Sequence, residues 1–269
     1  MKLLIFCVFT LVPTSLFSQK NNQNVTEEFG AYQNNYFGFT VDQTNHEEVG
    51  RAKLKLSKTH PLLFENTFYW GYIFKSWIDL KQLNVPTSEY NCSSDLIYKV
   101  NLSKLIGSDY FIIGLWKFEM AIDYGPESRK AHSSYLETRY IYKSFSFTPR
   151  ISFPSIPFQK KITFPGNEDI LEYKEFLELC IRYENGKRNI HQVWLNVGNT
   201  FRKGNFQYQW TIGISDILTT FGFKCIPELN TSLILQYWNG YGESLKNYKQ
   251  YSQRVMIGIS LTDLELIKE

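Results

Sequence analysis

The chain has 269 residues, and its 29 Lys and Arg against 26 Asp and Glu leave a formal charge of only +3. This near-neutral balance gives no reason to expect a nucleic-acid partner. Charged residues make up 20% of the chain, which is too many for a bundle of transmembrane helices, and the 43% of apolar residues excludes a disordered chain.

The N-terminus has the pattern of a secretory signal peptide. Met1 and Lys2 form a short basic region, Leu3 to Phe17 is apolar, and Ser18 and Gln19 follow as a cleavage point. The apolar run is short for a membrane-spanning helix, which needs about 20 residues. We therefore expect a signal peptide at residues 1–18, followed by a Gln/Asn-rich N-terminal extension at residues 19–45.

The segments after residue 45 alternate between apolar and polar residues. In Asn205–Thr211, in Leu177–Glu184 and in Leu115–Tyr124, every second residue is apolar. Successive side chains of a strand point to opposite faces, so each segment has one apolar and one polar face. We count about eleven or twelve such runs between Gly50 and Leu264, most near the roughly 9–11 residues that a spanning strand needs.

These strands fit a membrane barrel better than a soluble fold. A soluble β-sandwich or a secreted binding barrel also alternates, but aromatic residues make up 17% of this chain and gather near strand ends, as in the girdles of a barrel in lipid. The sequence predicts an all-β, antiparallel outer-membrane β-barrel of about 12 strands over residues 46–269. Its outward face should include Trp116, Phe118, Met120, Phe206, Tyr208 and Trp210, and its lumen Lys53, Lys55, Lys117, Glu119, Arg139, Arg182 and Glu184.

One run near the C-terminus carries a family resemblance. Gly240-Tyr241-Gly242-Glu243-Ser244-Leu245, with Asn247-Tyr248 and Arg254-Val255 after it, resembles the last two strands of the outer membrane phospholipase A (phospholipase A1) family. Lys75-Ser76-Trp77 and Glu119-Met120 match upstream in the family's order, and the resemblance covers about residues 32–264. Taken alone, the glycines of the run indicate only a bend at a strand end.

The resemblance implies an activity and a location. The family is a 12-stranded barrel of the bacterial-type outer membrane that hydrolyses acyl esters of glycerophospholipids with calcium. It implies membrane phospholipid or lipopolysaccharide as partner, and it allows a homodimer.

The family's catalytic residues are replaced in this chain. The resemblance implies a His and a Ser two residues apart on one strand and an Asn on the next, but those positions read Tyr124, Pro126 and Thr138. A serine needs a base to take its proton. Tyr124 is a poor base because a phenol has a pKa of about 10, and Pro126 has no nucleophile. We therefore expect a catalytically impaired or inactive member.

The calcium site implied by the resemblance is also eroded. Its carbonyl ligand would come from Arg129 and a hydroxyl ligand from Ser134, while an acid position reads Ala131. The loop that would reach the partner chain is short and reads Asn84-Val85-Pro86. A hard cation needs several oxygen ligands, so calcium binding is in doubt.

Two alternatives stay open. Ser128, His132 and Ser134 lie in a predicted loop, Pro126–Ser134, and could form a relocated site, with Glu127 or Glu137 orienting the base; polar loop residues often have no such role. The second alternative, of another class, is a structural or lipid-binding outer-membrane barrel.

Overall fold

The computed structural model describes residues 35–44, 47–63, 67–80, 88–100, 108, 110–122, 129–153, 172–173, 176–185, 189–214, 217, 231–243, 245 and 248–260. In this part of the chain twelve strands form one closed antiparallel barrel, in which each strand pairs with its sequence neighbours and β1 pairs with β12. The predicted barrel of about 12 strands is confirmed. None of the described residues belongs to a helix long and apolar enough to cross a membrane.

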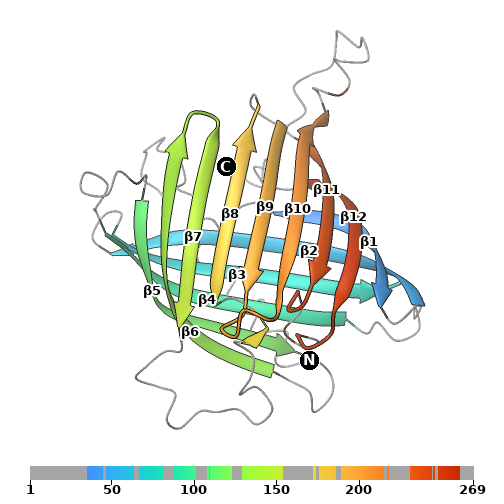
Figure 1. Ribbon diagram of the computed structural model, residues 1–269, viewed down its shortest axis with the longest axis horizontal. Coiled ribbons are helices and arrows are strands. Elements are labelled where there is room, and N and C mark those ends of the chain that lie inside the picture. Colours follow the sequence, from blue (N-terminus) through green and yellow to red (C-terminus); the bar gives the residue numbers. More distant parts are fainter. Residues whose placement is uncertain are drawn as a thin grey trace, which may run out of the picture.

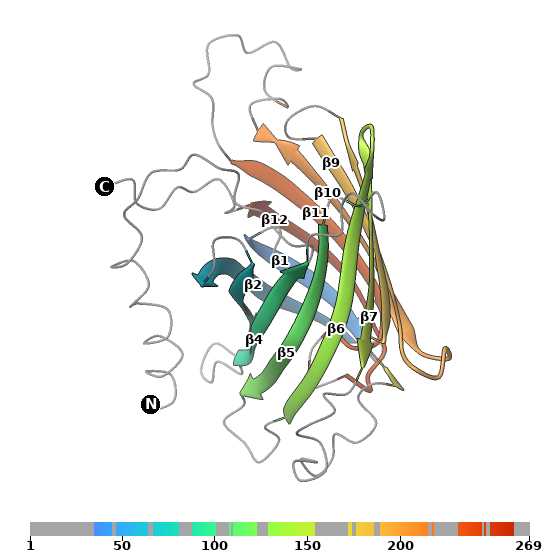
Figure 2. The same ribbon diagram turned by 90° about the vertical axis from the view of Figure 1, so that its left-hand side faces the viewer.

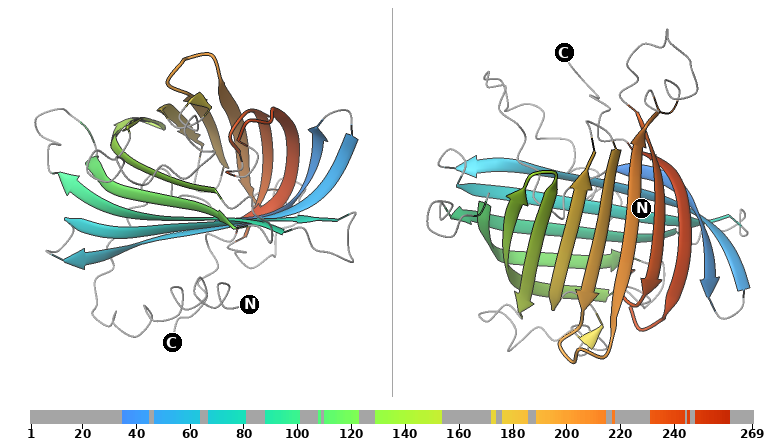
Figure 3. Two further views of the ribbon diagram at one scale, coloured as in Figure 1. Left: turned by 90° about the horizontal axis from the view of Figure 1, so that it is seen from below. Right: turned by 45° about the horizontal axis from the view of Figure 1, so that its top comes forward.

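The strands differ in length between two walls of the barrel. Strands β2 to β6 have 12 to 17 residues and β7 to β12 have 8 to 10. In Figure 1, β7 to β10 run steeply across the front and β2 to β4 cross behind them, and Figure 2 looks onto β4 to β6. Figure 3 shows that the shorter strands arch over a flatter wall. The bounds are β1 Tyr36–Thr44, β2 Glu47–Leu63, β3 Phe68–Asp79, β4 Ser88–Val100, β5 Tyr110–Ile122, β6 Arg129–Tyr142, β7 Phe145–Phe153, β8 Leu177–Glu184, β9 Asn189–Val197, β10 Gly204–Gly213, β11 Ser232–Gly240 and β12 Ser252–Ser260.

The prediction of an N-terminal extension over residues 19–45 is corrected, because the last part of it forms strand β1 of the barrel. Residues 36–44, which were expected outside the barrel, pair with both β2 and β12. Without them the edge of β12 would be unpaired, and an open edge is costly in a membrane barrel. The predicted signal peptide, residues 1–18, lies outside the described residues.

The barrel has two different ends. The chain enters β1 and leaves β12 at one end, which we call the terminus end. The connections β3–β4, β5–β6, β7–β8 and β11–β12 all lie at the other, which we call the loop end. Strand β6 begins at Arg129, so residues 129–134 are strand and not the predicted loop.

The outward face is apolar and aromatic. In β12 the outward Val255, Ile257 and Ile259 are exposed, whereas Arg254 and Met256, which alternate with them, are buried. The six residues predicted to face outward do so: Trp116, Phe118, Met120, Phe206, Tyr208 and Trp210 all alternate with residues that line the lumen. An apolar band around a polar interior is the pattern of a barrel in a lipid bilayer.

The residues predicted to face the lumen also do so. Lys53, Lys55, Lys117 and Glu119 line the central cavity, and Lys117 Nζ lies 3.1 Å from Glu119 Oε1. Near the terminus end, Arg182 Nε lies 2.5 Å from Glu184 Oε1. The Arg139 guanidinium lies 4.7 Å from the centre of the Tyr110 ring. Pairing inside the barrel avoids the cost of leaving these charges alone in a poorly hydrated interior.

A buried polar network joins β4, β5, β6 and β7 near the terminus end. Glu137 and Arg150 form an ion pair in which both side chains are at most 5% exposed. The Tyr110 hydroxyl donates to Glu137 at 2.7 Å. The Arg150 guanidinium lies 4.4 Å from the centre of the Tyr135 ring, whose hydroxyl donates to Asp95 at 3.2 Å. The network thus fixes the register of four neighbouring strands.

The space for the Tyr135 ring is made by Gly114. A Cβ atom at position 114 would lie 2.1 Å from Tyr135 Cε1, which is well inside van der Waals contact. Gly114 lies at a β-bulge, where the pairing of β5 with β6 shifts between Gly114 and Lys117. The bulge and the missing side chain together let a large aromatic ring lie inside a narrow barrel.

We expect Gly114→Ala to destabilise the barrel by about 1–3 kcal/mol, because the Tyr135 ring must leave its place and lose its polar contacts. The measurement is denaturant unfolding in detergent micelles, followed by tryptophan fluorescence. Gly50→Ala is the matched control, since a Cβ there meets only Leu80 Cδ1 at 3.7 Å. Equal stability of the two variants would contradict this packing.

The Glu137–Arg150 pair gives a second prediction for the same measurement. Glu137→Gln leaves the guanidinium of Arg150 buried without its counter-charge, and we expect a loss of about 3–5 kcal/mol. Glu184→Gln removes one charge from the pair Arg182–Glu184, in which the Glu184 side chain is 49% exposed. We expect that control to lose less than about 1 kcal/mol. A mild effect of Glu137→Gln would mean that the pair is not desolvated.

Candidate functional site

Thr138, the position that the resemblance gives for the family's Asn, lies well inside strand β6. Thr138 is nine residues along β6 from Arg129, where the strand begins. At about 3.3 Å per residue it is therefore roughly 30 Å from the end of the hairpin that carries residues 123–128. Its hydroxyl donates to the Tyr110 carbonyl at 2.8 Å. Tyr124 and Pro126 lie in 123–128, outside the described residues, as does Ser128.

The relocated candidates His132 and Ser134 lie on the outward face of β6. Ser133, Tyr135 and Glu137 between and after them are buried in the lumen. His132 pairs across the ladder with Phe118, and the two ring centres are 4.9 Å apart. The pair therefore lies on the lipid side, inside a strand rather than in a loop.

The hydrogen bonds of these two residues do not prepare a nucleophile. The Trp116 indole N–H donates to His132 Nδ1 at 3.2 Å. A neutral imidazole has one acceptor nitrogen, so this bond leaves the proton on Nε2 and no free lone pair to accept a serine proton. The Ser134 hydroxyl donates to the Leu115 carbonyl at 3.0 Å. Neither side chain is thus arranged as one half of a Ser–His pair.

Glu137 cannot orient His132. Its side chain points into the lumen, on the opposite face of β6, and is held there by Arg150. The other candidate, Glu127, lies outside the described residues. The geometry therefore contains no third member for a His132–Ser134 site in the part of the chain that the structure describes.

The residues present do not fit a calcium ion. Arg129 and Ser134 are five residues apart on an extended strand, or roughly 16 Å, whereas calcium ligands lie at about 2.3–2.6 Å from the ion. Ala131, at the family's acid position, packs against an apolar cluster that includes Ala121 and Leu245. Within the described residues, no group of three His, Cys, Asp or Glu side chains could hold a metal. The short loop Asn84-Val85-Pro86 lies outside them.

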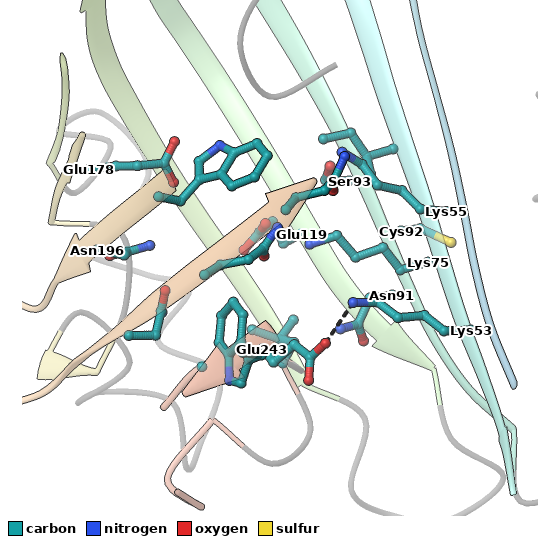
Figure 4. A pocket seen from close by; sticks show the side chains of 18 of the residues that line it. Lys53, Lys55, Lys75, Asn91, Cys92, Ser93, Glu119, Glu178, Asn196 and Glu243 are labelled. Atoms are coloured by element: carbon teal, nitrogen blue, oxygen red, sulfur yellow. Dashed lines mark hydrogen bonds and ion pairs between the residues drawn. The ribbon is translucent and has the colours of Figure 1, made fainter. Parts of the chain in front are cut away.

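The lumen contains a polar cavity of about 140 Å³. Figure 4 shows Lys53, Lys55 and Lys75 on one wall and Glu178 with Asn196 on the opposite side. Glu119 and Glu243 lie between them in the same view. The charged side chains that line the cavity are unequal in number, with five cations against three anions: Lys53, Lys55, Lys75, Lys117 and Arg150 against Glu119, Glu178 and Glu243.

Glu243 is a buried, ion-paired carboxylate that the sequence analysis did not name as a candidate site residue. It lies between β11 and β12, is 8% exposed, and its carboxylate pairs with Lys53 at 2.6 Å and with Arg254. Burial by itself would raise the pKa of Glu243, but the charges of Arg254 and Lys53 outweigh it and hold that pKa at about 2. The only sequence signal was its place in the Gly-Tyr-Gly-Glu-Ser-Leu run, which indicated a bend.

Comparison with known proteins agrees with this architecture. The model of the family Phospholipase A1 matches residues 9–261. The chain is similar to the outer membrane phospholipase of Salmonella typhi, determined as a dimer with bound calcium, at 16% identity over 90% of this chain and 94% of that one, with a TM-score of 0.67. It is also similar to outer membrane phospholipase A of Escherichia coli, at 17% identity over 87% and 98%, with a TM-score of 0.64. No curated protein matches the chain.

The family match covers most of the chain, and the fold has the apolar outer band and polar lumen of a barrel in lipid. The chain therefore belongs to the phospholipase A1 family of outer-membrane β-barrels.

Proposed function

We propose that this barrel contacts membrane phospholipid without the hydrolysis that is typical of its family. The observation that carries the proposal is the engagement of His132 and Ser134 on β6, where His132 accepts from Trp116 and Ser134 donates to the Leu115 carbonyl instead of pairing with each other. An ester hydrolase needs its base, nucleophile and orienting group within hydrogen-bond reach of one another. Tyr124 and Pro126 supply neither the base nor the nucleophile of such a site.

The outer face supports a role in contact with lipid. Trp116, Phe118 and His132 form a stacked cluster on the lipid side of β5 and β6, with ring centres 4.9 to 6.0 Å apart. Amphipathic rings of this kind prefer the boundary between acyl chains and headgroups. Phospholipid is accordingly the partner we propose, in a structural or lipid-binding role. Lipopolysaccharide is a second lipid that such a surface would meet.

A homodimer is a further part of this proposal. Its support is the similarity to the Salmonella typhi protein, whose structure is a dimer with bound calcium. Calcium is not carried over as a cofactor, because Arg129 and Ser134 lie too far apart on β6 to share one ion.

An active hydrolase with relocated residues is the second candidate. One observation favours it: His132 and Ser134 share the outward face of β6, on the side where lipid would lie. Both side chains would have to leave their present hydrogen bonds with Trp116 and Leu115 to meet each other.

We expect the refolded protein to release no fatty acid above a heat-inactivated control in mixed phospholipid micelles with calcium. Loss of triad members lowers a rate by several orders of magnitude, for example about 10⁶-fold in one serine protease. His132→Ala and Ser134→Ala should leave this background unchanged. Release that is abolished by Ser134→Ala or Ser128→Ala would establish the relocated site instead.

Restoring the family residues should not restore activity. In the triple variant Tyr124→His, Pro126→Ser and Thr138→Asn, the new Asn is still roughly 30 Å along β6 from the hairpin end. The same assay should therefore stay at background while circular dichroism remains that of a β-barrel. Clear turnover by the triple variant would show that the β5–β6 register differs from the one described.

A further inference from the structure

One wall of the polar cavity has two lysines at directly opposite positions of neighbouring strands. Lys55 of β2 pairs in register with Lys75 of β3, and both residues line the cavity. Figure 4 shows them on the same wall as Lys53. Residues at such positions have Cβ atoms about 4.5–5.5 Å apart, and like charges there destabilise a sheet. The lysine pair therefore has an energetic cost, which an anion bound between the two ammonium groups would offset.

The carboxylates that line the cavity each have a cation beside them that is neither of these two lysines. The pairs are Glu243 with Lys53 at 2.6 Å, Glu119 with Lys117 at 3.1 Å, and Glu178 directly opposite Arg150 in the register of β7 and β8. Outside the lining, Arg254 adds a positive charge at Glu243, and Glu137 adds a negative charge at Arg150. Lys55 and Lys75 thus make up the positive surplus of the lining. The surplus concerns net charge, and neither side chain needs to be free for it to hold.

The same wall offers a neutral hydrogen-bond donor. Ser93 of β4 lines the cavity and lies opposite Ile73, two residues from Lys75 on the same face of β3. A serine hydroxyl can donate to an oxyanion, and lysine ammonium groups have three donors each. Two charged donors and one neutral donor on three neighbouring strands suit a ligand with several acceptor oxygens.

The size of the cavity limits the ligand to a small ion. Its volume is about 140 Å³, and a cavity of about 150 Å³ is large enough for one benzene molecule. An ion of the size of phosphate or sulfate fits into such a volume. A phospholipid with its acyl chains does not, so the headgroup of a membrane lipid is not the ligand that this cavity suits.

We propose that the lumen binds a small oxyanion of the phosphate type, held by the ammonium groups of Lys55 and Lys75 with the Ser93 hydroxyl as a further donor. Hydrogen bonds from an ammonium group to a phosphate oxygen are charge-assisted and belong to the stronger class. The bound anion offsets the repulsion between the two lysines. The site does not depend on the proposed loss of hydrolysis, because none of its residues belongs to the β5–β6 hairpin.

Inorganic phosphate is the probe that tests the site. Phosphate is titrated into the refolded protein in a zwitterionic detergent at neutral pH, at an ionic strength held constant with sodium chloride, and binding is followed by calorimetry. We expect the parent to bind phosphate and sulfate to compete for the same site. Lys55→Gln and Lys75→Gln should each weaken binding at least about tenfold, because each removes one charge-assisted contact.

Two further variants separate a ligand site from a merely structural pair of lysines. Lys58→Gln is the matched control, because it removes a lysine from the same strand that is exposed and does not line the cavity, and it should bind phosphate like the parent. Glu119→Gln removes a carboxylate from the lining and should tighten phosphate binding. A purely structural role of the lysines predicts no such gain.

Unfolding in urea gives a second measurement on the same proteins. A ligand that binds only the folded barrel raises its stability by mass action, so phosphate should raise the unfolding midpoint of the parent but not that of the lysine variants. Without phosphate, the lysine variants should be at least as stable as the parent, because the like-charge pair is gone. If one lysine variant fails to fold, the other decides. A folded parent that binds no phosphate, a folded lysine variant that binds it as tightly as the parent, or an equal loss in Lys58→Gln would overturn the proposal.

Discussion

Closure of the sheet by β1 against β12 is the constraint on which the rest of this structure depends. Once Tyr36 is opposite Ser260 and Phe39 opposite Ile257, every strand around the ring has a fixed partner on both sides. The alternation of side chains then assigns each residue to the lipid face or to the lumen. At this seam Gly38 faces Gly258, and a Cβ on Gly38 would lie only 2.8 Å from the Ile257 carbonyl.

The same alternation limits the chemistry of the β5–β6 hairpin. His132 and Ser134 belong to the outer face, and Glu137, which would have to orient a base, belongs to the lumen. No rotation of side chains brings a residue from one face of a strand to the other. The family's fold is thus retained, and the wall of the barrel separates Glu137 from His132 and Ser134.

The interior of a narrow barrel has to neutralise its own charges. Glu137 with Arg150 does so near the terminus end, and Glu243 with Lys53 and Arg254 does so near the closure. Between these clusters the cavity has lysines on one wall and Glu178 with Asn196 on the other. In the part of the chain that the structure describes, the lumen therefore contains neutralised ion pairs and a polar cavity of about 140 Å³.

The sequence by itself determined the class of fold and the two faces of the strands. Alternation in segments such as Asn205–Thr211 depends only on neighbouring residues, so it predicted strands, the outward Trp210 and the inward Lys53 correctly. Even the Glu137–Arg150 pair was open to prediction, because both residues lie five positions from the ends of the tight turn between Tyr142 and Phe145.

The tertiary structure decided what depends on partners distant in the chain. It placed residues 36–44 in the barrel, because β12 needs an edge to pair with. It turned Glu243 inward, because the charges that hold it come from β2 and β12. It also set the start of β6 at Arg129, opposite Ala121, and so placed Thr138 nine residues from the hairpin end.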